Sequence, residues 1–275
     1  MKIDTHQHLW KYSKEQYPWI GEGMEVLARD RLAADLEPLL EANGIDGTVA
    51  VQARQVVEET EALLAMAEEY DFIRGVVGWV DLRSPDLEAQ LERFRDRKKL
   101  VGVRHVVQEE PDEKFVVRED FMRGIGKLGA YDLVYDILVF PHQLPASIEL
   151  VRRFPDQAFI LDHIAKPYIK DKKMSPWDSD IRKLASFENV SCKLSGMVTE
   201  ADWHNWTVDD FRPYMEVVLE AFGAERLTIG SDWPVCTLAG QYGSVVSIAA
   251  DFIAQLSDNE QKAIWEGNPE RIYGL

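Results

Sequence analysis

The sequence predicts an α/β fold: a single (β/α)8 barrel with a long loop after its first strand. Two observations favour this fold. Short runs rich in β-branched residues recur along the chain, and each is followed by a longer stretch whose apolar residues have helical spacing. Such alternation is typical of parallel strands joined by right-handed crossovers. The chain has 275 residues, and single barrels of this kind commonly take about 250. We therefore treat residues 1–275 as one domain.

The predicted strands are short, apolar and evenly distributed. They are Lys2–His6, Thr48–Gln52, Ile73–Val80, Leu100–Val106, Leu133–Leu138, Phe159–His163, Val190–Leu194 and Leu227–Ser231. The alternative to a closed barrel is an open, doubly wound sheet. That architecture usually has a glycine-rich phosphate turn after its first strand, and this chain has none. The strand pattern therefore favours the barrel.

Local signals mark several helices between these strands. Leu32–Ala42 ends at Gly44, which suits a left-handed cap, and Ser84-Pro85 pairs a capping serine with a first-turn proline. Ser257–Glu260 is a capping box. The longest connection without predicted structure, residues 9–29, carries several aromatic residues. We expect it either to cover the barrel mouth as a lid or to pack against the first helix.

Composition restricts the partners of the protein. A formal net charge of −17 offers no basic face for nucleic acid or an anionic membrane. No apolar run reaches the roughly 18 residues that cross a bilayer. The only two cysteines, Cys192 and Cys236, exclude a disulfide framework and favour a reducing environment. We expect a cytoplasmic protein that acts on a small molecule, and the sequence predicts no particular oligomeric state.

Polar and ionisable residues gather at the carboxyl ends of the predicted strands, where barrels of this class build their active sites. Burying so many charges would cost several kcal/mol each before pairing, so we interpret this end as a functional mouth. In chain order the residues are His6, His8, Gln52, Arg54, Trp79, Asp81, Arg104, His105, Asp136, Asp162, His163, Lys166, Lys193, Ser195, Asp232 and Trp233.

Strand geometry refines this set. His6 and His8 are two residues apart, so their imidazoles would lie side by side on one face of a strand. Such a pair can hold a metal ion, polarise a substrate oxygen or simply bond to neighbouring groups. Arg104 and His105 are adjacent and would point to opposite faces, and we expect Arg104 to face inward.

Several segments together resemble the amidohydrolase superfamily, and within it the sugar-lactonase branch. The resemblance spans nearly the whole chain, and its order makes chance matches improbable. It rests on the paired histidines His6 and His8, Tyr17–Trp19, Val76–Leu82, Gly102–His105, Leu161–Pro167, Cys192–Gly196, Gly230–Val235 and Asn268–Tyr273. It implies hydrolysis of a sugar-acid lactone, such as L-fucono- or L-rhamnonolactone, to the open hydroxy acid.

The resemblance also suggests roles for the residues at the mouth. Asp232 is the expected general base; the alternatives are a helix cap or a partner for an arginine. His163, His6 and His8 would polarise the carbonyl or hold a metal ion. Three cations would contact substrate or stabilise negative charge, although each of the two lysines can instead form a salt bridge with Asp162 or Asp136. These cations are Arg104, Lys193 and Lys166, while Gln52 and Trp79 would form the pocket wall and Trp233 would stack on a sugar ring.

The predicted fifth strand departs from the metal-dependent members of the superfamily because it offers Asp136 and no histidine. We therefore expect no binuclear site. Either His6, His8, His163 and Asp232 collect a single divalent ion, with zinc the natural choice, or no cofactor is required. We favour the second, since a lactone is already activated compared with an amide.

Two other functions remain as alternatives. The first is another amidohydrolase-type reaction, either hydrolysis of a pyrone dicarboxylate lactone or metal-dependent decarboxylation of an aromatic acid. The second is a sugar-binding barrel without catalytic activity, which would have no reason to retain an acidic base beside histidines.

Overall fold

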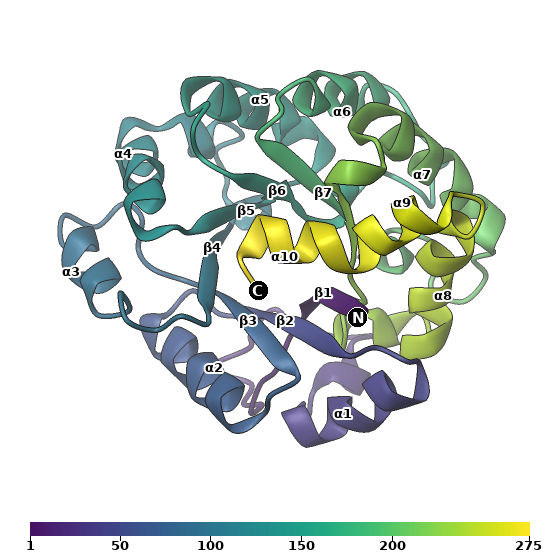
Figure 1. Cartoon of the computed structure of the whole chain (residues 1–275), viewed down its shortest axis with the longest axis horizontal. Helices are drawn as coiled ribbons and strands as arrows, with labels where there is room; N and C mark the ends of the chain where they lie inside the picture. The colour runs from purple at the N-terminus through teal and green to yellow at the C-terminus, as the bar shows by residue number, and fades with distance from the viewer.

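The computed structural model describes residues 1–275 and forms a barrel of eight parallel strands (Figure 1). Neighbours in the sheet follow the order of the sequence, from β1 to β8. The strands are β1 (Ile3–Gln7), β2 (Gly47–Val51), β3 (Ile73–Gly78), β4 (Leu100–Val106), β5 (Val134–Leu138), β6 (Phe159–Leu161), β7 (Val190–Leu194) and β8 (Leu227–Ile229). All eight predicted strands are confirmed.

Hydrogen bonds between the first strand and the segment after the last one close the sheet. His8 N donates to Trp233 O at 2.6 Å, and Asp232 N donates to His6 O at 2.8 Å. The hydroxyls of Thr5 and Thr228 also lie 2.9 Å apart across this seam. The closure therefore brings His6, His8 and Asp232 together, although they are far apart in the sequence.

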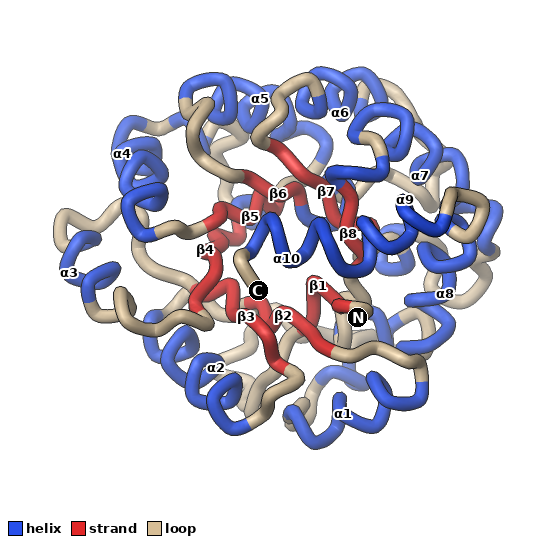
Figure 2. The backbone as a smooth tube through the Cα atoms, viewed as in Figure 1, coloured by secondary structure: helices blue, strands red, loops and turns tan.

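Helices surround the strands, as Figure 2 shows. They are α1 (Ala33–Ala42), α2 (Val57–Glu69), α3 (Leu87–Glu92), α4 (Glu119–Leu128), α5 (Leu144–Arg153), α6 (Trp177–Ala185), α7 (Val208–Phe222), α8 (Tyr242–Ile253), α9 (Asp258–Lys262) and α10 (Asn268–Tyr273). None of them is long and apolar enough to span a membrane. The helix α10 lies across the end of the barrel where the strands begin (Figure 1).

The predicted local signals have the expected geometry at both ends of the chain. Gly44 follows α1 with a φ of +63°, a left-handed conformation that glycine adopts without strain. Ser257 accepts a hydrogen bond from Glu260 N at the start of α9, and Glu260 bonds back to Ser257 N. The helix predicted after Ser84-Pro85 begins slightly later, at Leu87.

Apolar residues fill two regions of the barrel. The larger core lies between the strands and the surrounding helices. A smaller cluster groups residues of six strands with Tyr273 of α10: Ile3, Val49, Val51, Val77, Val101, Val134, Ile160 and Tyr273. This cluster closes the end of the barrel where α10 lies.

Candidate active site

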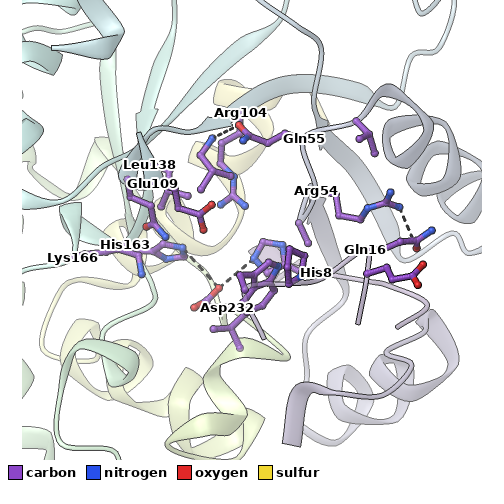
Figure 3. A pocket seen from close by; sticks show the side chains of 18 residues that line it. His8, Gln16, Arg54, Gln55, Arg104, Glu109, Leu138, His163, Lys166 and Asp232 are labelled. Atoms are coloured by element: carbon purple, nitrogen blue, oxygen red, sulfur yellow. Dashed lines mark hydrogen bonds and ion pairs between the residues drawn. The ribbon is translucent and has the colours of Figure 1, made fainter. Parts of the chain in front are cut away.

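A pocket of about 450 Å³ opens where the strands end (Figure 3). This is the end at which barrels of this class carry their active sites. Its lining residues come from the ends of several strands and from the loops that follow them. They are His8, Glu15, Gln16, Pro18, Trp19, Ala53, Arg54, Gln55, Val56, Arg104, Val106, Gln108, Glu109, Leu138, His163, Lys166, Asp232 and Val235.

Three imidazoles converge on one carboxylate oxygen at the base of this pocket. Asp232 Oδ1 lies 3.4 Å from His8 Nε2, 3.8 Å from His163 Nε2 and 3.9 Å from His6 Nε2. The ring centroids of His6 and His163 are 4.3 Å apart, and those of His6 and His8 are 5.0 Å apart. The prediction that His6 and His8 lie side by side is therefore confirmed.

The other nitrogen of each imidazole has a partner behind the cluster. His8 Nδ1 lies 2.8 Å from Val51 O, His163 Nδ1 lies 2.9 Å from Ser195 Oγ, and His6 Nδ1 lies 3.4 Å from Asp162 Oδ1. A carbonyl oxygen can only accept, so a neutral His8 carries its proton on Nδ1 and turns the lone pair of Nε2 toward Asp232.

This donor set fits a divalent metal ion. In the neutral form of His8, a lone pair of Nε2 and a carboxylate oxygen of Asp232 face each other at 3.4 Å, and a cation between them would stabilise this arrangement. Ligand atoms of His6, His8 and Asp232 lie within 4.8 Å of one another. Histidine nitrogens with one carboxylate are typical zinc ligands, and bonds to the second ring nitrogen typically orient them.

Burial determines the charge states at this site. It holds the pKa of His6 and of His163 well below the ordinary value, so both rings are neutral at pH 7. Burial alone would raise the pKa of Asp232, but His163 and His8 more than offset that effect and lower it. The site therefore combines an ionised carboxylate with the neutral imidazoles of His6 and His163.

Unusual backbone conformations place these side chains. Residues His163, Ile164, Ala165 and Lys166 all have positive φ, between +48° and +58°, directly after β6. Gly196 faces this segment with a φ of +61°, and a Cβ there would lie 2.3 Å from His163 Nδ1. Runs of left-handed non-glycine residues are strained and cluster at functional sites. The glycine is thus needed for the position of His163.

Six of the residues predicted at the mouth line the pocket: His8, Arg54, Arg104, His163, Lys166 and Asp232. The inward choice of Arg104 over its neighbour agrees with the structure. His105 lies on the other side of the strand, where its ring stacks on Phe115 at 4.9 Å and accepts a hydrogen bond from Trp79 Nε1. His6 is fully buried and contacts the cluster from below.

Lys193 differs most from its predicted role. Its ammonium group has no exposed surface, donates to Asp136 and lies 2.9 Å from Asp162 Oδ1. Arg104 Nη1 bonds to the other oxygen of Asp162 at 3.0 Å. Lys193 therefore forms a buried salt bridge, which was the alternative to substrate contact. Its Nζ also lies 3.2 Å from Nδ1 of His6 and supports that ring.

Three more residues expected around the substrate lie outside the pocket lining. Gln52 is buried and accepts hydrogen bonds from Arg104, and the Nε1 of Trp79 is directed to His105. Trp233 is also buried, with the guanidinium of Arg31 above its ring at 5.8 Å. The predicted wall and stacking roles of these three residues are therefore replaced by contacts with other protein side chains.

The structure adds pocket residues that strand ends did not reveal. Glu15, Gln16 and Trp19 come from the long loop after β1, so part of that loop does form a wall of the mouth. Gln108 and Glu109 follow β4 in a short 3₁₀ turn. Such turns have no periodic pattern in the sequence. For the loop after β1, the only sequence signal of a place at the mouth was its aromatic content.

Comparisons with known proteins give matches over most or all of the chain. The amidohydrolase family model matches residues 3–275. An L-fucono-1,5-lactonase of Burkholderia multivorans is 43% identical over 286 aligned residues, covering 100% of this chain and 96% of the relative. An L-fucono-1,5-lactonase of Burkholderia ambifaria is 38% identical over 88% of this chain and 83% of the relative.

A solved structure resembles this chain over nearly its whole length. It is an amidohydrolase of Burkholderia multivorans with bound zinc, which is 43% identical and superposes with a TM-score of 0.97. The match covers 100% of this chain and 99% of that one.

Proposed function

The chain belongs to the amidohydrolase family, and on that premise we propose that its pocket hydrolyses a sugar-acid lactone, with L-fucono-1,5-lactone as the first candidate. The observation that carries this proposal is the convergence of Asp232 with three imidazoles at the base of the pocket. The identity of 43% over the whole chain with an L-fucono-1,5-lactonase supports the choice of substrate.

Ring opening needs a base, a group that stabilises negative charge, and a proton for the departing oxygen. Asp232 takes a proton from water as the water oxygen attacks the carbonyl carbon. The bond between this carbon and the ring oxygen then breaks, and Asp232 returns the proton to that oxygen. Lys166 lines the same pocket, and the donors of its ammonium group that Glu200 does not use stabilise the charge that develops on oxygen.

A single zinc ion suits the same cluster, held by His6, His8, His163 and Asp232. When bound, it would supply Lewis-acid polarisation of the lactone carbonyl. The orientation of His8 supports this ligand role, because its neutral form has no proton on Nε2 to donate to a substrate oxygen. We therefore propose that these residues bind zinc, in place of the metal-free site that the sequence favoured.

The pocket offers less to a dicarboxylate substrate. Two of its three cations already have carboxylate partners: Arg104 is paired with Asp162 at 3.0 Å and Lys166 with Glu200 at 2.8 Å. A neutral sugar lactone needs no unpaired cations for binding. It therefore suits the few unpaired positive charges of the pocket better than a pyrone dicarboxylate does.

Exchange of the proposed base tests the function directly. Asp232→Asn should lower kcat for L-fucono-1,5-lactone by at least about a hundredfold, because a positioned base typically contributes a factor of this order or more. Acid release followed with a pH indicator measures the rate, and circular dichroism checks the fold. Asp209→Asn, at an exposed position in α7, is the matched control. If Asp232→Asn retains its activity, Asp232 is not the general base.

The proposed zinc site predicts a metal requirement. Protein purified without added metal should contain about one zinc per chain by mass spectrometry. Chelation should abolish turnover, and added zinc should restore it. The double variant His6→Ala, His8→Ala should lose the metal while Asp209→Asn keeps it. Full activity of metal-free wild-type protein would instead support a site that uses only protein groups.

A further inference from the structure

The pocket has a second group of polar side chains, apart from the histidines and Asp232. Figure 3 shows Arg54 directed toward Gln16, away from the cluster around Asp232. Arg54 Nη1 lies 3.4 Å from Gln16 Oε1, and its guanidinium lies over the ring of Tyr17 at 5.7 Å. The loop after β2 and the long loop after β1 therefore meet at this side chain.

Arg54 differs from the other two cations of the pocket because no carboxylate lies within ion-pair distance of it. Arg104 and Lys166 use their charge on Asp162 and Glu200. The guanidinium of Arg54 contacts one amide oxygen and the side chain of Tyr17, through the ring face and a hydrogen bond. Since a guanidinium carries five N–H donors, most of those of Arg54 stay available to a ligand in the pocket.

A buried carboxylate holds the backbone of Arg54 in place. Glu59, in the first turn of α2, accepts hydrogen bonds from Arg54 N at 2.7 Å and from Ala53 N at 2.9 Å through Oε2. Its other oxygen accepts from the hydroxyl of Tyr17 at 3.3 Å. One side chain thus joins both loops that carry this wall of the pocket.

Keeping this carboxylate in place has an energetic cost. Glu59 is 5% exposed, and burial raises its pKa to about 7, although the two backbone N–H groups act in the opposite direction. A neutral or apolar residue would avoid that cost. A positioning role for Glu59, which holds Arg54 at the pocket, accounts for this buried carboxylate.

We propose that Arg54 is a specificity-determining residue that donates hydrogen bonds to hydroxyl groups of the sugar lactone, and that Glu59 is the positioning residue that holds it there. This inference rests on the proposed function. The planar fork of a guanidinium matches two neighbouring oxygens, which adjacent hydroxyls on a sugar ring provide. An unsubstituted lactone of the same ring size has no such oxygens and gains nothing from Arg54.

Steady-state kinetics with L-fucono-1,5-lactone test the assignment. Arg54→Met should raise KM about tenfold or more, since hydrogen bonds from charged donors are the stronger ones, while kcat changes less than about threefold because the reacting atoms lie near Asp232. Glu59→Gln should raise KM in the same way but to a smaller extent. The inhibition constant of δ-valerolactone, which has no hydroxyl group, should stay the same in both variants.

Several controls separate this role from a purely structural one. Glu61 lies on the same helix as Glu59 and forms an exposed ion pair with Arg93, so Glu61→Gln should leave KM unchanged. If circular dichroism shows that Arg54→Met does not fold, Arg54→Lys takes its place. Its KM should also rise, but by less than that of Arg54→Met. A general loss of structure would lower kcat and weaken the binding of both lactones.

An unchanged KM in Arg54→Met, a loss confined to kcat, or an equal loss of affinity for both lactones would each overturn the inference. Failure of the proposed function is distinguishable from these results. In that case the wild-type protein itself would not hydrolyse L-fucono-1,5-lactone, whereas wild-type turnover with unaffected variants rejects the role of Arg54 and Glu59 alone.

Discussion

At the scale of single residues, burial determines which charged side chains reach the pocket. Lys193, Asp136 and Asp162 have no exposed surface and form one buried network. Burial alone would raise the pKa of Asp162, but Lys193, His6 and Arg104 together hold it well below its ordinary value. Oppositely charged groups stabilise each other in such a network, so the loss of one leaves another unpaired.

This pairing predicts the result of removing the Lys193 ammonium group. Lys193→Met should lower the free energy of unfolding by about 3–5 kcal/mol, because Asp136 would lose its only cation and Asp162 would keep Arg104 alone. Urea unfolding followed by fluorescence measures the loss.

The same variant separates two roles for Lys193. A direct contact with substrate predicts a higher KM with little change in stability, which would contradict the structural role. Lys183→Met is the matched control, since that lysine is exposed and pairs with Asp180 within α6.

At the scale of elements, the segment after β6 packs closely against the segment after β7, where Gly196 contacts His163. The four left-handed residues 163–166 direct His163 into the pocket. Gly196 leaves room for the imidazole, and its φ of +61° would strain any other residue. The position of His163 therefore depends on both segments together.

Gly196→Ala should consequently impair the site more than the fold. The new Cβ would lie 2.3 Å from His163 Nδ1, so the ring must move and lose its alignment with Asp232. We expect kcat to fall by about a hundredfold, as misplacement of a reacting group by about 1 Å can do.

A second glycine provides the comparison for this variant. Gly267 has helical geometry, and a Cβ there would meet nothing within 4 Å. Gly267→Ala should keep full activity and stabilise slightly. Equal activity of the Gly196→Ala and Gly267→Ala proteins would show that His163 tolerates displacement.

At the scale of the whole molecule, the two ends of the barrel have different tasks. One end carries the pocket, and the other is closed by α10 (Figure 1). Tyr273 of α10 packs in the small apolar cluster and donates from its hydroxyl to Asp136 Oδ2 at 2.9 Å. The last helix thus supports the buried charge network from below.

This division of tasks predicts a change in stability without a change in catalysis. Tyr273→Phe should destabilise the protein by about 1.5–3 kcal/mol, the usual effect of losing a hydrogen bond to a charged group. Its KM and kcat for L-fucono-1,5-lactone should match those of the wild type below the melting temperature. Calorimetry and the pH-indicator assay measure the two quantities, and a selective loss of kcat would connect this end of the barrel to catalysis.

The order of elements and the general location of the site follow from the sequence alone. Alternating strand and helix patterns leave few ways to bury the strands, and the barrel brings the carboxyl ends of all strands to one face. His8, His163, Arg104, Lys166 and Asp232 were therefore identified as pocket residues from their places after strands.

Only the tertiary structure decided how the side chains pair. Lys193 and Arg104 follow the same strand-end pattern, yet one is enclosed by two carboxylates and the other reaches the pocket. Likewise Glu59, at the start of a helix, shows no sequence signal for its bonds to Tyr17 and Arg54. These roles depend on contacts between distant segments, and a periodic pattern describes only the residues near each other along one element.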